Sequence, residues 1–426
     1  MGMLDLNLIR RDPELVRAGL RRRQGDPGIV DAILEVDRRR RELQQEVDRL
    51  RRERKLRSEE LGRLREEERE AQRAGLRELS ERLREIEGQL AAAERELEGL
   101  LLKLPNLPSE DTPDGRDASG NVPVRTWGTK PEFAFDPLDH VELGRRLGIL
   151  DLERGAKVSG SRYYFLKGAG VLLEMALIQM AMDLLVREGF TPLIPPMLVR
   201  QDLLVGAMGG DHLDTLQVYR VAEEDLALIG TSEHPMAAMF SGEVLEEESL
   251  PIRLAGFSSC FRREAGSYGR DVRGVFRVHQ FEKVEMFSFA HPERSREEHE
   301  YLVSLQERFL QSLGLHYRVV SICAGDMGLP AAKQYDIETW MPGRGDYGET
   351  HSCSNCTDFQ ARRLRIRFRP KGRGGSEYVH TLNGTLMAST RTIIAILENF
   401  QQPDGSVRVP PALVPYMNGV EVLKPL

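Results

Sequence analysis

Residues 276–287 have the sequence FRVHQFEKVEMF, in which apolar and charged side chains alternate. This alternation predicts a β-strand, because successive side chains of a strand point to opposite faces of the sheet. The preceding residues 260–264, CFRRE, are separated from this strand by a glycine-rich polar stretch at 266–274. We therefore expect a hairpin of two antiparallel strands joined by a long loop.

The returning strand of this hairpin places Phe281, Lys283 and Glu285 on the same face of the sheet. A carboxylate between aromatic side chains on a sheet face needs a polar partner. An internal ion pair of Arg262 with Glu264 or Glu285 would satisfy this need, and so would a bound substrate. The pattern leaves both interpretations open.

The second part of the chain, from about residue 122, mixes helix and strand signals. The stretch 172–188 predicts a helix that is apolar on almost all sides and is followed by Gly189. Such a helix should be buried in a core or against another subunit. The expected helices are 172–188, 296–313 and 392–400, and the expected strands are 190–194, 276–289 and 364–368. Because strict βαβ repetition is absent, the pattern predicts an α+β domain built on an antiparallel β-sheet flanked by helices.

Residues 31–103 differ in composition from the rest of the chain. They contain 19 basic and 20 acidic residues and no proline, histidine or aromatic residue, which cannot build an ordinary core. Apolar residues recur at spacings of three and four from 76 to 104, and less regularly from 29 to 64. We therefore expect an antiparallel two-helix coiled-coil arm at about 28–104 that folds back near Gly75.

Basic residues outnumber acidic ones by ten to four between Arg38 and Arg57, on the first helix of this arm. Such a local excess can follow a phosphate backbone, although a solvated helix surface is the ordinary alternative. Ahead of the arm, Asp12 and Pro13 predict the start of a short helix.

A polar, proline-containing stretch at 105–121 follows the arm and predicts a linker. We therefore expect an N-terminal domain at 1–110 and a second domain at 111–426. The most apolar stretch, 172–186, is shorter than a membrane span and is interrupted by charged residues.

The chain has 426 residues and a formal net charge of −7, with 40% hydrophobic and 30% charged side chains. This composition excludes a fibrous or wholly disordered protein and argues against a broadly basic protein that coats nucleic acid. Its four cysteines are too few for a disulfide framework, and the N-terminus lacks a signal peptide of the usual kind. We expect a cytoplasmic protein with no membrane association.

Two further motifs suggest sites that their context does not support. Residues 343–348 match G-x-G-x-x-G but follow Trp340-Met341-Pro342 and open no helix, so dinucleotide binding is not expected. No P-loop sequence occurs. Cys353 and Cys356 form a C-x-x-C pair without a second such pair, so we expect buried free cysteines and no zinc.

Several motifs in the same chain resemble the class II aminoacyl-tRNA synthetases, and among them the bacterial seryl-tRNA synthetases. The hairpin at about 257–289 is similar to motif 2 of the class, 170–200 to motif 1 and 380–401 to motif 3. Further matching stretches are TSE at 231–233, SCSNCTDFQARR at 352–363 and LENFQ at 397–401. With the arm, the resemblance covers essentially the whole chain and implies a tRNA-binding arm followed by a class II catalytic domain.

The resemblance implies an ATP-dependent serine–tRNA ligase that works in protein biosynthesis. L-serine and ATP would give seryl-adenylate and pyrophosphate, and the seryl group would then pass to the 3′-terminal ribose of tRNA(Ser). It further implies Mg²⁺ with ATP, a homodimer formed through motif 1, and contact of the arm with the long variable arm of the tRNA. Whether tRNA(Sec) is also a substrate stays open.

Carried over residue by residue, the resemblance assigns roles in the expected catalytic domain and in the arm. The catalytic residues are Arg262, Glu264 and Arg391. The ATP-binding residues are Arg262, Glu264, Val278, Phe281, Glu349, Thr350, His351, Ser352 and Arg391, of which Glu349 and Ser352 would hold magnesium. The serine-binding residues are Thr231, Ser232, Glu233, Arg262, Glu285, Asn383 and Thr385, and the tRNA-binding residues are Arg38, Arg41, Arg49, Arg52 and Lys55.

The chain departs from the family pattern at two places. Motif 3 keeps a single glycine, Gly384, before Arg391, and His351 stands where a smaller residue is expected. Two other functions would also use parts of this pattern: a ligase that loads a carrier other than tRNA, and a coiled-coil interaction protein with an inactive body. The arm disfavours the first, and the intact set of charged motif residues disfavours the second.

Overall fold

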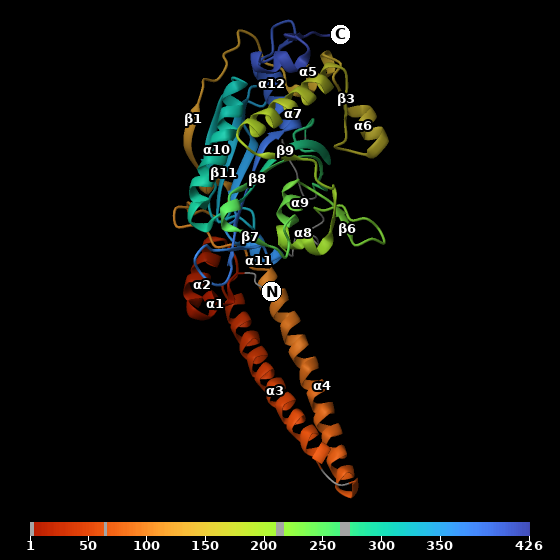
Figure 1. Ribbon diagram of the computed structural model, residues 1–426. Helices are drawn as coiled ribbons and strands as arrows, with labels where there is room; N and C mark the ends of the chain where they lie inside the picture. The colour runs from red at the N-terminus through yellow and green to blue at the C-terminus, as the bar shows by residue number, and fades with distance from the viewer. Residues whose placement is uncertain (1–3, 64–65, 210–216, 265–272) are drawn as a thin grey trace. The chain divides into compact units, whose positions relative to one another are not determined.

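The computed structural model describes the chain except for residues 1–3, 64–65, 210–216 and 265–272 (Figure 1). The chain divides into two compact units. The first consists of the residues up to Arg21 together with Gly25–Leu104, and the second of Arg22–Gln24 and Pro105–Leu426.

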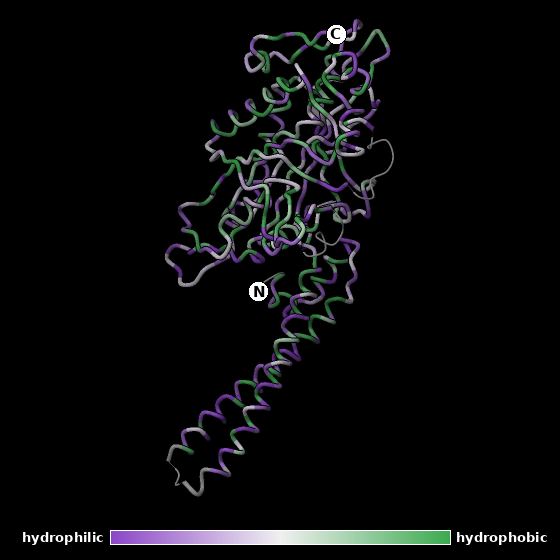
Figure 2. Tube along the Cα trace, turned by 90° about the vertical axis from the view of Figure 1, so that its right-hand side faces the viewer, coloured by the Kyte–Doolittle hydropathy of each residue, from purple (hydrophilic) through white to green (hydrophobic). Residues whose placement is uncertain are grey.

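The first unit contains a pair of long helices, α3 (Ile29–Arg63) and α4 (Glu66–Leu102), which lie side by side in Figure 1. Apolar and polar residues alternate along both helices (Figure 2), and the apolar side chains form a buried seam. The fully or nearly fully buried seam residues include Val47, Leu50, Leu83, Ile86, Ala93, Leu97 and Leu104. The predicted helical arm is confirmed.

The expected fold-back near Gly75 is wrong, because Gly75 lies inside α4 and the chain reverses between Arg63 and Glu66. A Cβ atom on Gly75 would lie 3.6 Å from Nη1 of Arg57. This is an ordinary van der Waals distance, so the position does not require a glycine for space. The loss of heptad register at this point lies inside a continuous helix and does not mark a turn.

Two short helices, α1 (Leu6–Arg11) and α2 (Pro13–Arg22), precede the arm. Oδ1 of Asp12 accepts a hydrogen bond from the backbone N–H of Leu15 at 3.0 Å, which confirms the predicted helix start. Asp37 of α3 is 1% exposed and accepts two hydrogen bonds from Arg10, at 2.8 and 2.7 Å. This buried bidentate pair fastens α1 to α3.

The second unit is built on an eight-stranded sheet with the order β1-β10-β11-β12-β15-β9-β8-β4. Every neighbouring pair is antiparallel except β4 and β8. The strands are β1 (Val122–Trp127), β4 (Thr191–Leu193), β8 (Ile252–Phe261), β9 (Gln280–Ala290), β10 (Tyr317–Ser321), β11 (Lys333–Met341), β12 (Asp346–Asn355) and β15 (His380–Ala388). The predicted α+β class and antiparallel sheet are confirmed.

The predicted hairpin is formed by β8 and β9, in which Cys260 pairs with Phe281. The expected strand at 364–368 is only partly correct, because Leu364 ends helix α11 and β13 covers Arg367–Arg369 in a separate sheet. The remaining strands are β2 (Leu150–Asp151), β3 (Phe165–Leu166), β5 (Leu198–Arg200), β6 (Leu226–Leu228), β7 (Val244–Glu246), β14 (Glu377–Tyr378), β16 (Val407–Arg408) and β17 (Val422–Leu423).

Helices flank the large sheet (Figure 1). They are α5 (His140–Arg146), α6 (Leu152–Ser159), α7 (Ala169–Arg187), α8 (Gln201–Met208), α9 (Glu233–Ala238), α10 (Ser295–Ser312), α11 (Phe359–Leu364) and α12 (Ser389–Asn399). The predicted helices at 172–188, 296–313 and 392–400 correspond to α7, α10 and α12. All three contribute side chains to the main hydrophobic core.

Helix α7 buries Leu173, Leu177 and Leu185 completely in this core. Among the described residues it is also the one helix whose length and composition would suit a membrane span, but 39% of that stretch is buried inside the structure. A core helix of a soluble protein has the same composition, so this is weak support for a membrane protein.

The structure locates the two motifs noted above, the one at 343–348 and the pair Cys353 and Cys356. Gly343 lies in the turn between β11 and β12, which are antiparallel, so its motif does not join a strand to a helix as dinucleotide binding requires. All four cysteines are free and buried, including Cys353 and Cys356.

Candidate active site

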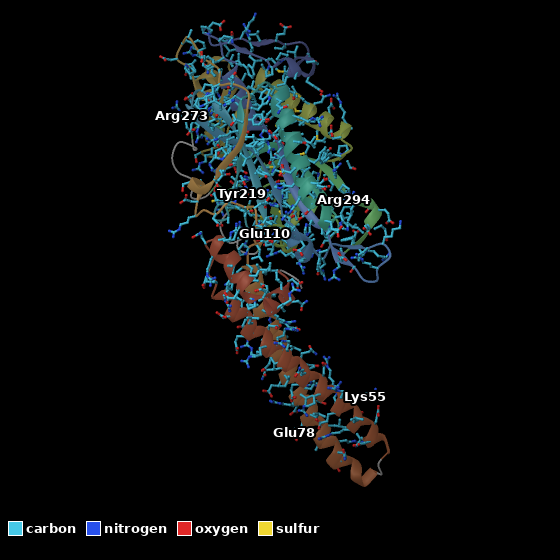
Figure 3. The ribbon with its side chains drawn as sticks, turned by 90° about the vertical axis from the view of Figure 1, so that its left-hand side faces the viewer. Lys55, Glu78, Glu110, Tyr219, Arg273 and Arg294 are labelled. Carbon is cyan, nitrogen blue, oxygen red and sulfur yellow. The ribbon has the colours of Figure 1, made fainter. Side chains whose placement is uncertain are left out.

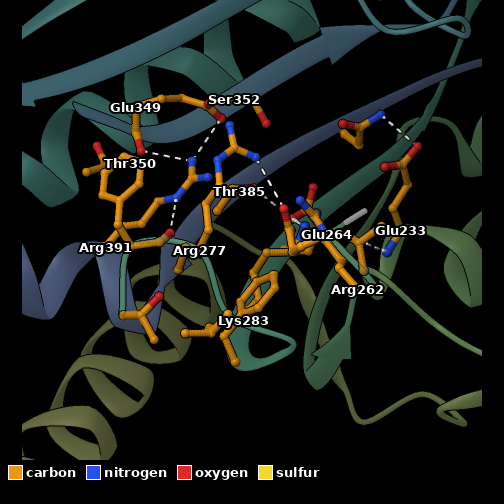
Figure 4. Close-up of a pocket in the computed structure, with 18 residues that line it drawn as sticks. Glu233, Arg262, Glu264, Arg277, Lys283, Glu349, Thr350, Ser352, Thr385 and Arg391 are labelled. Atoms are coloured by element: carbon orange, nitrogen blue, oxygen red, sulfur yellow. Dashed lines mark hydrogen bonds and ion pairs between the residues drawn. The ribbon is translucent and has the colours of Figure 1, made fainter. Parts of the chain in front are cut away.

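A cavity lies on the face of the large sheet to which Phe281, Lys283 and Glu285 point (Figure 4). Its walls come from β9, β12, β15, the start of α9 and the residues just after β8 and just before β9, with the first turn of α12 at one end. The sequence-predicted residues that line it are Thr231, Glu233, Arg262, Glu264, Val278, Phe281, Glu285, Glu349, Thr350, Ser352, Asn383, Thr385 and Arg391. Segments up to 160 residues apart in the chain therefore meet in one place.

Arg262 follows the end of β8, and its Nε donates a hydrogen bond to the carbonyl oxygen of Gly230 at 3.1 Å. The guanidinium carbon lies 5.3 Å from the ring centre of Phe281, within the range of a cation–π contact. The bond to Gly230 fixes the plane of the guanidinium group. A fixed, planar cation beside an aromatic ring suits a carboxylate or phosphate ligand whose neighbouring base stacks on that ring.

Glu264 adopts a left-handed backbone conformation, with φ of 47°. Its carbonyl oxygen accepts a hydrogen bond from Nη1 of Arg162 at 2.8 Å, and its carboxylate Oε2 lies 3.3 Å from Nη1 of Arg277. A non-glycine residue in this region costs free energy, and such strain is concentrated at functional sites. The surrounding bonds hold the Glu264 carboxylate at the cavity wall.

A second group of cations lies at the α12 end of the cavity (Figure 4). Nη1 of Arg391 donates to the carbonyl oxygen of Glu349 at 2.9 Å and lies 3.2 Å from its carboxylate Oε1. The guanidinium carbon of Arg391 is 4.8 Å from the ring centre of Phe276, and its Nε donates to the Phe276 carbonyl oxygen at 3.4 Å. With Arg277 also in the cavity wall, this end suits an anion of several charges.

Glu285 and Lys283 form a buried ion pair in which Nζ and Oε2 are 2.5 Å apart. They are only 2% and 5% exposed. Oε2 of Glu285 also accepts a hydrogen bond from the Thr385 hydroxyl at 3.0 Å. These groups form a compact polar pocket with donors and acceptors held at fixed positions.

Glu233 lies beside this pocket and is held by two amides. Its Oε1 accepts hydrogen bonds from Nε2 of Gln360 at 2.8 Å and from Nδ2 of Asn383 at 3.1 Å. Burial, and next the negative charge of Glu285, raise the pKa of Glu233 to about 7. The nearby cation Lys283 is already paired with Glu285, so it does not form an ion pair with Glu233.

A second cavity of about 490 Å³ adjoins the first and shares seven of its lining residues, Thr231, Glu233, Arg262, Glu264, Arg277, Ser352 and Asn383. Its further walls include Met208, Gln217, Leu329 and Cys356. A volume of this size accommodates a drug-sized ligand. The polar pocket around Glu285 therefore connects to space for a larger group.

Two sequence-predicted residues do not line the cavity. Ser232 is fully buried and its hydroxyl donates to the Gly256 carbonyl oxygen at 3.1 Å. His351 is 1% exposed, and burial lowers its pKa to about 4, so the ring is neutral. Both residues support the site from behind.

Five lining residues were not assigned from the sequence: Phe276, Arg277, Lys283, Ala388 and Thr390. Lys283 could have been assigned to the site from the sequence, because alternation along 276–287 puts it on the same face as Glu285. Arg277 could not, since it precedes β9 and strand alternation does not set its direction.

The residues at the Glu349 end fit a magnesium ion only in part. Glu349 and Ser352 lie on β12 and supply oxygen atoms, and Asp336 pairs with Ser352 across β11 and β12. Burial and the neighbouring Glu349 raise the pKa of Asp336 well above its usual range, as expected for carboxylates short of a cation. No cluster of three or more His, Cys, Asp or Glu side chains with metal-binding geometry occurs in the described part of the chain. A magnesium ion here would need further oxygen ligands from a bound phosphate.

Comparisons with known proteins agree with this geometry. Residues 3–108 match the family model of the seryl-tRNA synthetase N-terminal domain, and residues 217–400 match that of the class II tRNA synthetase core domain for G, H, P, S and T. A serine–tRNA ligase of Rubrobacter xylanophilus is 48% identical over 430 residues, which cover 99% of each chain. One of Nocardia farcinica is 48% identical over 424 residues, covering 99% of this chain and all of the relative.

Solved structures give the same result. A seryl-tRNA synthetase from Pyrococcus horikoshii, complexed with ATP, superimposes with a TM-score of 0.93 at 43% identity and covers all of both chains. A cytoplasmic serine–tRNA ligase from Naegleria fowleri in complex with AMP gives 0.87 at 36% identity, covering all of this chain and 99% of the other. From the motifs, the cavity and these full-length likenesses, the chain belongs to the seryl-tRNA synthetase family of class II aminoacyl-tRNA synthetases.

Proposed function

We propose that this protein is an ATP-dependent serine–tRNA ligase that makes seryl-adenylate and then seryl-tRNA(Ser). The observation that carries the proposal is the arrangement of one cavity. Three arginines, Arg262, Arg277 and Arg391, line the same cavity as the small polar pocket of Glu285 and Thr385. A polyphosphate and a small hydroxy amino acid would therefore meet side by side.

In the first step a carboxylate oxygen of serine attacks the α-phosphorus of ATP. A new P–O bond forms, the bond to the bridging oxygen breaks, and pyrophosphate leaves with that electron pair. A carboxylate needs no general base, so the protein contributes alignment and charge neutralisation. Arg262 would bridge the serine carboxylate and the α-phosphate, with adenine on Phe281, and Arg391 would bind the phosphate tail.

Serine would be selected by the polar pocket. The Thr385 hydroxyl and the carboxylates of Glu285 and Glu233 are held in place by hydrogen bonds before any substrate arrives. Alanine and glycine lack the hydroxyl and would leave buried groups unpaired, which costs binding free energy. Threonine would have to be excluded by shape.

Magnesium would be held by Glu349 and Ser352 together with phosphate oxygens of ATP. It would supply charge neutralisation on the phosphates. The protein's own contribution at this end is the Arg391–Glu349 contact, which fixes both side chains beside the phosphate tail.

In the second step a hydroxyl of the 3′-terminal ribose of tRNA(Ser) attacks the carbonyl carbon of seryl-adenylate. An ester bond forms, the acyl–phosphate bond breaks, AMP leaves and the hydroxyl proton is released. The adjoining cavity of about 490 Å³ is the space from which a terminal nucleotide would reach the adenylate.

The arm would contact the long variable arm of the tRNA. The residues proposed for this contact, Arg38, Arg41, Arg49, Arg52 and Lys55, are all exposed, and Figure 3 shows Lys55 at the surface. Arg38, Arg41 and Arg49 are paired with acidic residues of the arm itself, at distances from 2.7 to 3.4 Å. The pairs of Arg38 and Arg49 lie largely in solvent and are therefore weak, so a phosphate can replace the carboxylate, whereas Arg41 is paired with the buried Asp37.

Helix α7 would form a homodimer interface. Its exposed apolar side chains include Val171, Met175 and Val186, which follow one stripe and are 40%, 54% and 50% exposed. Apolar side chains grouped in this way favour a protein–protein contact. A Met175→Lys variant should sediment as a monomer, and an unchanged dimer would contradict this assignment. The proposed location is the cytoplasm.

Transfer of labelled serine to unfractionated tRNA, with ATP and magnesium, tests the proposal. We expect charging with serine and none with threonine or alanine under the same conditions. Serine-dependent pyrophosphate exchange without any charging would instead favour a ligase that loads another carrier. Absence of both activities in folded protein would contradict the proposal.

A further inference from the structure

Strands β12 and β15 separate at the point where they carry the two halves of the cavity. They pair at Asn355 with Leu382, Ser354 with Asn383 and Cys353 with Gly384, and the pairing ends there. The next residues, Ser352 on β12 and Thr385 on β15, both line the cavity. No backbone ladder sets the distance between them.

Both strands also contain a bulge at this point. The β11–β12 register shifts so that Thr350 has no partner, and the β15–β9 register shifts so that Leu386 has none. Bulges bend a strand and redirect the neighbouring side chains. The directions of Glu349 and Thr385, which flank the two bulges, therefore depend on what holds the bulged residues.

His351 connects the two bulges. Its Nε2 donates to the carbonyl oxygen of Leu386 at 2.9 Å, because a carbonyl oxygen can only accept. Its Nδ1 then accepts from the Thr350 hydroxyl at 2.8 Å. The ring thus spans from β12 to β15 with a partner at each nitrogen.

Gln306 spans the gap between β12 and β15 from the face of the sheet opposite the cavity. It lies on α10 and is completely buried. Its Nε2 donates to the carbonyl oxygens of Ser352 and Thr385, both at 2.8 Å. A Cβ atom on Gly384 would come within 3.3 Å of this nitrogen, which places the amide directly behind the last paired residue.

The other end of the Gln306 amide makes no such bond. Among the described residues, no donor reaches its Oε1, although this oxygen is buried. An apolar side chain of similar length would remove this unsatisfied acceptor, but it would also take the Nε2 donor away from the carbonyl oxygens of Ser352 and Thr385. What the amide adds is therefore the pair of bonds across the gap.

We propose that Gln306 and His351 are positioning residues that set the separation of β12 and β15, and thereby align the phosphate-binding half of the site with the serine-binding half. This inference rests on the proposed adenylate-forming activity. Neither residue touches substrate. Each acts through the backbone of residues that do, Ser352, Thr385 and the flanking Glu349.

The test compares Gln306→Met with Gln311→Met in the full-length protein. Gln311 lies on the same helix and also donates one hydrogen bond, from Nε2 to the Tyr317 hydroxyl at 2.8 Å, but it lies away from the gap. The readouts are kcat, KM for serine and KM for ATP in serine-dependent pyrophosphate exchange, together with the melting temperature. Gln306→Met should lower kcat at least about tenfold, because small misplacements of reacting groups are costly. Gln311→Met should keep the wild-type kcat.

His351 provides a second, independent comparison. His351→Leu loses both hydrogen bonds, whereas His351→Gln keeps a donor that can reach the Leu386 carbonyl oxygen. We expect a loss of kcat in the first variant and recovery of most of it in the second. A role in packing alone would make both variants equally active once folded, and only their melting temperatures would differ.

The outcomes separate this inference from the activity on which it rests. If the wild-type protein shows no serine-dependent exchange, the proposed function fails and the inference fails with it. If the wild type is active and folded Gln306→Met has unchanged kcat and KM values, the inference alone is overturned. A matching loss in Gln311→Met would also overturn it, because the effect would then belong to the helix and not to the gap.

Discussion

Serine binding should strengthen as the pH rises from about 6 to 8, because Glu233 must be ionised to hold the ammonium group of the substrate. Burial, and next the charge of Glu285, raise the pKa of Glu233 to about 7. Lys283 is already paired with Glu285, and the two groups that hold Glu233 are the uncharged amides of Gln360 and Asn383. We therefore expect the ammonium group of serine to supply the cation that Glu233 lacks.

The size of the effect follows from this pKa. A carboxyl group with a pKa near 7 is roughly 10% ionised at pH 6, half ionised at pH 7 and roughly 90% ionised at pH 8. If only the ionised form binds serine, the apparent KM for serine should fall about tenfold over this range. The KM for ATP should change much less, because Glu233 lies at the serine end of the cavity.

Serine-dependent pyrophosphate exchange, measured at fixed saturating ATP and magnesium, gives the KM for serine at each pH. The matched control is Glu233→Gln, in which the amide cannot ionise and the KM should be high and independent of pH. The reasoning is refuted by a wild-type KM that stays flat from pH 6 to 8. It is equally refuted if the full pH dependence persists in Glu233→Gln.

Without serine, the same group should affect stability with the opposite sign. The pKa of Glu233 is higher in the folded protein, at about 7, than the ordinary glutamate value of 4.5, so the folded state holds the proton more tightly. Its stabilising contribution is complete below the unfolded pKa and is lost as the pH rises through about 7. The melting temperature of the wild type, compared with that of Glu233→Gln, should therefore fall between about pH 5 and 8, and added serine should reduce the difference.

Three further predictions concern other parts of the chain. Lys283→Met should destabilise the protein by about 3–5 kcal/mol, measured by denaturant unfolding at neutral pH, because it leaves the buried carboxylate of Glu285 unpaired; equal stability would show that Glu285 takes up a proton instead. Arg262→Ala should reduce pyrophosphate exchange by at least about 10²-fold through loss of a fixed cation, and normal exchange would remove Arg262 from the site. Replacing residues 31–103 by a short linker should abolish serine transfer to tRNA while sparing exchange; loss of both activities would give the arm a structural role.

Features set by nearby residues could be predicted from the sequence. The seam of the arm follows from its heptads, and the shared face of Lys283 and Glu285 follows from alternation along one strand. The fold-back could not be placed correctly, because the heptad register breaks at Gly75 although α4 runs through this residue without interruption. A one-dimensional pattern does not distinguish a turn from a local break in register inside a continuous helix.

The hydrogen-bond networks of the site could not be predicted from the sequence, because their members lie far apart in the chain. Glu233 binds Gln360 and Asn383, which lie 127 and 150 residues further along the chain. The resemblance to a family identified Glu233 and Asn383 as pocket residues, but nothing in the sequence indicates that one accepts from the other. The raised pKa of Glu233 depends on that geometry and on Glu285, so it could only be obtained from the structure.

The two departures from the family pattern acquire one explanation in the structure. His351 stands where a smaller residue was expected, and Gly384 is the single glycine of motif 3. Gly384 is the last residue of β15 that pairs with β12, and the missing Cβ leaves space behind it for the amide of Gln306. His351 then closes the gap between the strands beyond that point. Because all three residues act at one break in the sheet, substitutions at Gln306 and His351 should not be additive. A double variant no worse than the more severe single variant would show that they control the same separation, whereas multiplied losses in kcat would show that they act independently.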